Sequence, residues 1–359
     1  MRGGERVLSQ VCRMFPGADL HTLIHVKGKG DAVIEGMRIR ESVLSRLPGV
    51  GGYYRWLLPV MPAVVGRMDL RDYELVLSLS HCVAKGVRVD PRAAHVCYCF
   101  TPMRYVWVDV GDEGRGGVGE WGLRMLAPWL RAWDRGTAAG VDQFMANSAN
   151  VARRIMSCYG REAEVVYSPV DTEFYTPDCT VGREDWYLVV SALTPYKRVE
   201  DAVIACGETG RKLKVIGSGP GLERIRKLAG AYSGIDVLGW RTDEEVREAY
   251  RRCRGLLMPQ EEDFGLVPLE ANACGAAVVA YGAGGALETV VDGVTGVLYS
   301  GQNSENLAKA IVRFEVGGIG GDVGKLVAWS GRFGAEKFRG GYGEVVREAL
   351  ALKGRNLWC

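Results

Sequence analysis

The chain has 359 residues, of which 47% are hydrophobic and 25% are charged, with a net charge of +2. This composition excludes a disordered or collagen-like chain, and the near-neutral charge predicts no nucleic-acid partner. The length predicts two domains. None of the ten cysteines forms a C-x-x-C pair, and most lie in apolar runs, where cysteine behaves as a small buried hydrophobic residue. This pattern favours a reducing cytosol and argues against a zinc site.

The first half of the chain predicts an irregular α/β domain over residues 1–170. Its expected strands are 20–26, 75–79, 95–100, 143–146 and 165–167, and its expected helices are 4–14, 55–68, 120–135 and 150–159. This half carries 22 Lys and Arg against 17 Asp and Glu. An anionic acceptor or a lipid surface would suit that excess, although ordinary solvated faces explain it more simply.

The second half alternates apolar strands with helices more regularly. Its expected strands are 187–193, 213–217, 235–239, 255–259 and 276–280, and its expected helices are 199–207, 222–232, 243–253, 266–273 and 286–291. Strands that are apolar throughout predict a parallel sheet covered on both faces.

The domain plan follows from this alternation and from one break in it. A stretch rich in Pro, Asp and Thr predicts a linker over 171–184, followed by a second domain over 185–330. Residues 331–359 predict a helical segment that packs back toward the first domain. The expected fold is two doubly wound α/β domains facing across a cleft, with ligands beyond the carboxyl ends of the strands.

The most informative stretch is MPQEEDFGLVPLEANACGAAVVAYGAGGALETVVDG, residues 258–293. Glu262 ends a strand-to-helix loop, and Glu270 lies eight residues on, in the next helix. The N–H groups of Gly265, Leu266 and Val267 open that helix, where a phosphate is favoured. Carboxylates beside a phosphate site suit hydroxyl groups, so the pattern predicts a nucleotide-sugar. The plainer alternative is an N-terminal charge and a solvated helix face.

These motifs resemble family 4 retaining glycosyltransferases of the GT-B fold. The residues that carry the resemblance are E-x7-E at 262 and 270, A-x-A-C-G after it, GGALET at 284–289 and D-G-x-T-G at 292–296. More narrowly, the chain resembles the branch of O-antigen and capsule mannosyltransferases. The segments that carry this resemblance are SALTPYKRVEDAV (191–203), CYCFTPMRY (97–105), ANS (146–148) and YSPVDTEFY (167–175). The resemblance implies transfer of a hexose, with GDP-mannose as the favoured donor, to a glycan or lipid-linked acceptor.

The resemblance also implies roles for individual residues. Glu262, Lys197 and Arg198 would be catalytic: Glu262 would bind hydroxyl groups of the donor sugar, and the two cations would neutralise the diphosphate leaving group. Glu270 would bind the ribose, and Phe264–Val267 would hold sugar and phosphate through backbone N–H groups. Leu238 and Gly239 would lie near the base. No metal or other cofactor is implied, and an arginine common in the wider family is replaced by Ala192.

Two departures concern the acceptor side, where the resemblance places Gly3, Gly4, Phe100 and Arg104. Relatives have a histidine where this chain has Phe100, which cannot take a proton. Relatives also carry a strand before the match to the R-G-G-E motif at residues 2–5. The first domain therefore lacks its expected first strand, and we expect an in-frame upstream extension of about 10–15 residues.

Two further features leave alternatives open. The loop containing Gly217 and Gly219 either lines the donor site or is a plain tight turn, and it fails the full dinucleotide fingerprint. A dinucleotide oxidoreductase and a non-catalytic sugar-nucleotide-binding subunit therefore remain rival hypotheses. In 120–135, Trp121, Met125, Trp129 and Trp133 recur every four residues beside arginines. Such a helix either lies on the inner face of a membrane or packs in the core or along the acceptor cleft.

Overall fold

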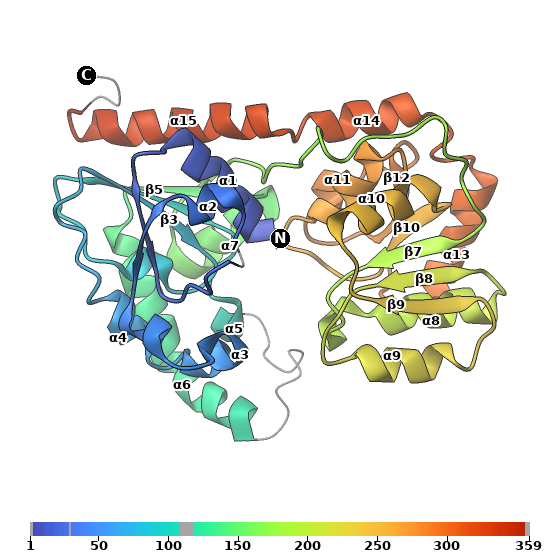
Figure 1. The fold of residues 1–359 in the computed structure, drawn as a ribbon, viewed down its shortest axis with the longest axis horizontal. Helices are drawn as coiled ribbons and strands as arrows, with labels where there is room; N and C mark the ends of the chain where they lie inside the picture. Colours follow the sequence, from blue (N-terminus) through green and yellow to red (C-terminus); the bar gives the residue numbers. More distant parts are fainter. Residues whose placement is uncertain (1–2, 29, 108–117, 356–359) are drawn as a thin grey trace. The chain divides into compact units, whose positions relative to one another are not determined.

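The structure is a computed structural model that describes residues 3–28, 30–107 and 118–355 (Figure 1). It divides into two compact units. Of the described residues, unit 1 comprises 3–28, 30–107, 118–169 and 336–355, and unit 2 comprises 170–335. Residues 170–184 thus lie with the second unit, and residues 336–355 with the first.

Unit 1 contains two parallel sheets. A two-stranded sheet pairs β1 with β2, and a four-stranded sheet has the order β3-β4-β5-β6. The strands are β1 Asp19–Thr22, β2 Arg38–Glu41, β3 Leu75–Ser80, β4 Ala94–Cys99, β5 Gln143–Ala146 and β6 Glu164–Val165. The helices are α1 Gly3–Met14, α2 Ala32–Glu35, η1 Val43–Arg46, α3 Val50–Tyr53, η2 Tyr54–Leu57, α4 Met61–Val65, η3 Ala84–Gly86, α5 Arg104–Trp107, α6 Val118–Thr137, η5 Ala138–Gly140, α7 Ala149–Tyr159 and, from the far end of the chain, α15 Ala335–Leu352.

Both faces of the four-stranded sheet of unit 1 are covered. Strand β4 is therefore buried along its whole length. On one face, Val96 and Tyr98 pack with α1 and α15 in a cluster that includes Phe338 and Tyr342. On the other face, Cys97 and Cys99 pack with α7. A third cluster joins α6 to the short helices between residues 43 and 65.

A buried charge network anchors α6 in unit 1. Lys85 forms an ion pair with Asp134, and both side chains are almost completely buried. Trp107 Nε1 and Tyr159 Oη each donate to Asp134 Oδ2 over 2.7 Å. Because a buried carboxylate is tolerated only when it is paired and hydrogen-bonded, this network fixes the position of α6 within its unit.

Unit 2 is a six-stranded parallel sheet of order β12-β11-β10-β7-β8-β9. The strands are β7 Tyr187–Val190, β8 Leu213–Ile216, β9 Ile235–Gly239, β10 Gly255–Met258, β11 Val278–Tyr281 and β12 Gly296–Tyr299. The helices are η6 Pro195–Lys197, α8 Val199–Glu208, α9 Leu222–Ala229, α10 Asp243–Arg252, α11 Leu266–Ala273, α12 Ala286–Thr289, α13 Ser304–Val316 and α14 Val323–Gly331.

Helices cover both faces of the unit 2 sheet (Figure 1). One face packs against α8, α9 and α13 in a cluster that contains Val189, Val203 and Ile311. The opposite face packs against α10, α11 and α12 through residues such as Leu188 and Ala271. The fully apolar strands of the sequence are therefore explained by burial on both sides.

Candidate active site

The chain order reverses at the centre of the unit 2 sheet. Strand β7 lies between β8 and β10, so the connections leave in opposite directions on its two sides. In open α/β sheets such a reversal leaves a crevice beyond the carboxyl ends of the strands, where ligands bind. The loops that follow β7 and β10 are therefore the first place to search for a site.

These two loops bring together Lys197 and Glu262. Lys197 Nζ lies 2.5 Å from Glu262 Oε1, with only 12% of the lysine side chain and 22% of the glutamate side chain exposed. Gln260 Nε2 donates to the same carboxylate oxygen over 3.0 Å. Two of the expected catalytic residues, 65 positions apart in the sequence, thus form one charged pair.

Two buried polar atoms close to this pair in the sequence have no hydrogen-bond partner among the described residues. They are Gln260 Oε1 and Thr194 Oγ1. Buried polar groups are nearly always satisfied, because an unmade hydrogen bond costs about 1–3 kcal/mol. An amide oxygen and a hydroxyl in these positions would suit the hydroxyl groups of a ligand. The sequence analysis did not single out Gln260; its position directly beyond an apolar strand and two residues before Glu262 was the available signal.

Arg198 lies beside the pair in an unusual backbone conformation. Its φ of 50° makes it the one non-glycine residue with positive φ among the residues described. Its guanidinium donates to Asp201 Oδ2 over 2.7 Å and to the carbonyl of Gln302 over 3.0 Å. These contacts hold Arg198 to α8 and to the loop after β12, so its expected role toward a phosphate remains a prediction.

The helix α11 begins at the same loop, with Gly265 as its N-cap at φ 94°. No side chain caps this end of the helix by accepting a hydrogen bond from its first N–H groups. Phe264 is buried and packs near Phe333. The N-terminus of α11 has the character of an anion site.

Gly285 explains why a second glycine-rich stretch accompanies the first. Its N–H donates to the carbonyl of Glu262 over 2.8 Å. A Cβ at Gly285 would lie 2.1 Å from the carbonyl oxygen of Phe264, so only glycine allows this approach. The GGALET motif therefore holds the backbone of residues 262–264 in place.

Glu270 is buried, so it does not lie on a solvated helix face, which was the simpler explanation of this residue. Tyr250 Oη donates to Glu270 Oε2 over 3.2 Å. Burial, together with the charge of Glu270, raises the pKa of Tyr250 well above its ordinary value, so the phenol stays a donor. The tyrosine orients the carboxylate from α10, and the ribose contact of Glu270 remains a prediction.

The glycine loop after β8 packs tightly on the loop after β7. A Cβ at Gly217 would lie 1.8 Å from the carbonyl oxygen of Ser191, and its φ is 151°. Gly219 makes a similar approach to Leu193, and Gly217 N–H donates to the carbonyl of Gly239 over 2.9 Å. Backbone packing accounts for these glycines. A donor contact by them, or by Leu238 beside Gly239, remains a prediction.

The acceptor-side residues lie in unit 1, and two of them are neighbours. Phe100 follows the carboxyl end of β4, and a Cβ at Gly4 would lie 3.6 Å from its ring. Phe100 also packs edge-on against Tyr98. Gly3 begins α1 and Arg104 begins α5. The ring of Phe100 thus packs against the first turn of α1.

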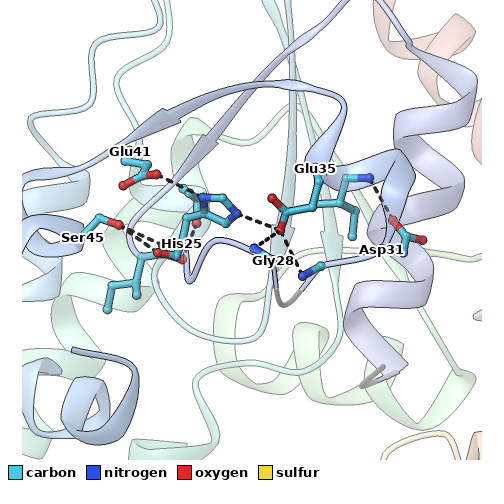
Figure 2. A network of polar contacts seen from close by, with 10 residues as sticks. His25, Gly28, Asp31, Glu35, Glu41 and Ser45 are labelled. Carbon is cyan, nitrogen blue, oxygen red and sulfur yellow. Dashed lines mark hydrogen bonds and ion pairs between the residues drawn. The ribbon is translucent and has the colours of Figure 1, made fainter. Parts of the chain in front are cut away.

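A polar cluster that the sequence did not predict lies beyond β1 and β2 in unit 1 (Figure 2). His25 Nδ1 lies 3.1 Å from Glu41 Oε1, and His25 Nε2 lies 3.1 Å from Glu35 Oε1. The N–H groups of Gly28 and Gly30 also donate to Glu35 Oε1. Hydrogen bonds to Glu35 and Glu41 raise the pKa of His25. The hydrogen bond with His25 lowers the pKa of Glu35, and hydrogen bonds with Ser45 and then His25 lower the pKa of Glu41.

In the described part of the chain, no group of three or more His, Cys, Asp or Glu is arranged to hold a metal ion. Independence from metal stays a prediction. Within residues 3–28, 30–107 and 118–355, no helix has both the length and the apolar character needed to cross a bilayer.

Comparison with known proteins bears on both units. The structure aligns with Anabaena HepE in complex with UDP-glucose at a TM-score of 0.72, with 18% identity, covering 97% of this chain and 96% of that one. It aligns with sucrose-phosphate synthase of Thermosynechococcus elongatus at a TM-score of 0.65, with 14% identity, covering 97% and 90%. The fold is GT-B.

Unit 2, which holds Lys197 and Glu262, also matches known proteins in its amino-acid sequence. Residues 180–317 match the family model for glycosyl transferases group 1. A D-inositol 3-phosphate glycosyltransferase of Geodermatophilus obscurus is 34% identical over 203 residues, 48% of this chain and 45% of that protein. A GDP-mannose-dependent alpha-(1-6)-phosphatidylinositol monomannoside mannosyltransferase of Mycobacterium tuberculosis is 30% identical over 220 residues, 54% and 57%. The chain thus spans about half the length of these relatives.

Proposed function

We propose that this protein is a retaining glycosyltransferase that moves a hexose from a nucleotide-diphosphate sugar to a glycan or lipid-linked acceptor. The observation that carries the proposal is the Lys197–Glu262 pair beside the uncapped end of α11, at the switch point of the sheet. A cation and the N–H groups of a helix end without a side-chain cap suit the diphosphate. The Glu262 carboxylate and Gln260 Oε1, which has no hydrogen-bond partner among the described residues, suit sugar hydroxyl groups. The match of residues 180–317 to glycosyl transferases group 1 supports it.

The chemistry would be a displacement at the anomeric carbon of the donor. The bond from that carbon to the diphosphate oxygen breaks, and the bond to the acceptor oxygen forms on the same face. The acceptor proton passes to the leaving phosphate oxygen. Lys197 and the N-terminus of α11 would stabilise charge that develops on the diphosphate, which is an effect realised in the transition state.

GDP-mannose is the donor that we propose, on the resemblance to mannosyltransferases of polysaccharide synthesis. The Mycobacterium tuberculosis relative is described as GDP-mannose-dependent. The solved Anabaena structure contains UDP-glucose, so the base and the sugar must be tested together. We also propose that the protein acts in a reducing cytoplasm, since all nine cysteines in the described residues are free thiols.

A panel of nucleotide-sugars tests the donor. Thermal shifts with GDP-mannose, UDP-glucose, UDP-galactose and NAD would rank binding, and release of nucleoside diphosphate in the presence of acceptor would report turnover. Retention is checked by the anomeric configuration of the product. The proposal is wrong if none of the nucleotide-sugars binds, and a response to NAD alone would favour an oxidoreductase.

Phe100 favours a second candidate function, a sugar-nucleotide-binding subunit without turnover. The aromatic ring stands where the family resemblance implies a histidine, and it packs against Tyr98 and the start of α1. It cannot exchange a proton. Tight binding of a nucleotide-sugar without transfer to any acceptor extract, under conditions where a mannosyltransferase standard is active, would support this candidate.

A further inference from the structure

Gln260 buries an amide group in the loop that follows β10. Only 2% of the residue is exposed. Its Nε2 donates to Glu262 Oε1 over 3.0 Å. This bond fixes the orientation of the amide, because the reverse orientation would place the amide oxygen against a carboxylate oxygen, where neither atom can donate. Gln260 Oε1 is therefore the end of the amide that has no hydrogen-bond partner among the described residues.

Holding Glu262 in place accounts for only one end of this amide. Buried polar atoms are nearly always hydrogen-bonded, because an unmade bond destabilises the protein. Gln143 Oε1 is also buried without a partner in the described residues, but it lies at the amino end of β5 in unit 1. Gln260 instead lies two residues beyond the carboxyl end of β10, where parallel sheets bind their ligands. Its position indicates that the missing partner is a ligand.

The missing partner must be a hydrogen-bond donor. An amide oxygen accepts and cannot donate, so an ionised phosphate, a carboxylate or a carbonyl group does not fit at Gln260 Oε1. A protonated amine would donate, but it would bring a second cation close to Lys197 Nζ, which lies 2.5 Å from Glu262 Oε1. The site therefore requires a neutral donor, and on a hexose that donor is a hydroxyl group.

Two adjacent acceptors select two neighbouring hydroxyl groups. Gln260 Nε2 and Oε1 are bonded to the same carbon atom, so a group bound to Oε1 lies next to the Glu262 carboxylate. We propose that Gln260 is a specificity-determining residue for the donor sugar. It accepts a hydrogen bond from the hydroxyl group next to the one that Glu262 binds, and it thereby selects a hexose with both groups over the deoxy sugar. This inference rests on the proposed function, in which Glu262 binds the donor sugar.

Donor analogues that each lack one hydroxyl group test the proposal by binding alone. The probes are the nucleotide-sugar that binds best in the panel and its monodeoxy analogues, and titration calorimetry gives their dissociation constants. In the wild type, the analogue without the hydroxyl group at Gln260 should bind about 5- to 150-fold more weakly than the full donor, because a buried oxygen stays unpaired. In Gln260→Met this ratio should fall to about twofold or less, since no acceptor remains.

The ratio of dissociation constants separates specificity from positioning. If Gln260 only held Glu262 in place, its replacement would weaken the full donor and every analogue equally, and all ratios would stay unchanged. Gln260→Asn is the second variant. It keeps an amide but withdraws it by one methylene group, so the same ratio should fall even where the methionine variant folds poorly. Gln143→Met is the matched control, because it removes another buried amide with an unpartnered oxygen and should change no ratio.

The outcomes distinguish this proposal from the proposed function. Equal ratios in the wild type and in both Gln260 variants overturn the specificity role and leave glycosyl transfer standing. A fall of the ratio in Gln143→Met as large as in Gln260→Met also overturns it. A wild type that binds no nucleotide-sugar removes the proposed function, and this inference with it. Because only binding is measured, the ratios decide equally well for a protein that binds the donor without turnover.

Discussion

Glu262 accepts hydrogen bonds from Lys197 and Gln260 through the same oxygen, Oε1. Glu262→Gln keeps the size of the side chain but removes its charge. We expect transfer to fall by about 10- to 150-fold, equivalent to roughly 1.5–3 kcal/mol of lost transition-state stabilisation. The measurement is kcat/KM for the best donor. Glu305→Gln is the matched control, since Glu305 forms an exposed ion pair with Lys309 in the same unit. Equal activity of the two variants would contradict the role of Glu262.

Lys197 is expected to act on the diphosphate rather than on folding. Lys197→Ala should raise the dissociation constant for the nucleotide-sugar by about 10- to 150-fold, because it removes a charge-assisted contact and leaves the Glu262 carboxylate facing the phosphates. Titration calorimetry measures the change, and thermal melting tests the fold. Lys309→Ala removes the lysine of an exposed pair and should change neither quantity. An unchanged affinity in Lys197→Ala would refute the assignment.

The elements of unit 2 follow from the sequence more closely than those of unit 1. Strand β9 and helix α11 have the expected bounds. In unit 1 the single helix expected over 55–68 is wrong. The chain forms η2 and α4 there, with Pro59 between them, because proline lacks the N–H that a continuous helix needs. Strands β2 and β12 were not predicted: β2, with the sequence RIRE, contains no apolar run, and β12, with the sequence GVLY, follows directly on a glycine-containing turn.

The sequence proposed individual residues for the candidate site but not the contacts between them. The motif spacing places Lys197 and Glu262 at strand ends, and sheet topology then brings those ends together. The contact of Gln260 with Glu262 and the tie between Arg198 and Asp201 are side-chain geometry that periodicity does not encode. His25 was not singled out from the sequence. Its two carboxylate partners lie in separate elements, α2 and β2, so no local sequence pattern predicts these contacts.

The His25 cluster makes the loop between β1 and α2 sensitive to pH. When the ring is protonated, both nitrogens donate, one to Glu35 and one to Glu41 (Figure 2). The pKa of His25 is raised above its ordinary 6.5, so the stability it contributes is complete below about pH 6.5 and is lost as pH rises through the raised value. The carboxylates, whose pKa values are lowered, remain ionised throughout that range.

His25→Gln tests this at the level of the loop. We expect the wild type to lose stability between pH 6 and pH 9 relative to the variant, because glutamine has no proton to release in that range. Urea unfolding at several pH values measures the difference. His21→Gln is the control. His21 contacts Tyr73, and burial lowers the pKa of its ring, so it should not reproduce the effect. Parallel pH curves for wild type and His25→Gln would contradict this account.

At the scale of the whole molecule, unit 1 is assembled from both ends of the chain. Helix α15 supplies Phe338, Tyr342 and Val346 to the cluster that covers β4. Phe338→Ala should cost about 3–5 kcal/mol of the stability of unit 1, because it removes a nearly fully buried ring. Unit 2 has its own core and should unfold at the wild-type midpoint.

Following the unfolding of each unit separately measures the difference in stability between unit 1 and unit 2 in the Phe338→Ala variant. Hydrogen exchange at β4 would report on unit 1, and exchange at β7 would report on unit 2. Leu352→Ala lies on the same helix but is 73% exposed in the wild type, so it should leave both units unchanged. Equal destabilisation of β4 and β7 by Phe338→Ala would show that the two units unfold together.

The interleaved layout of the chain also sets an order of events during translation. Everything in unit 2 is synthesised before α15, whereas the core of unit 1 is closed only by α15. Domains generally fold as units while the nascent chain emerges. Unit 2 can therefore complete its sheet on the ribosome, while one face of the β3-β4-β5 sheet is covered by α1 but not yet by α15. We expect this protein to need a chaperone most while the apolar face of unit 1 waits for α15 to be synthesised.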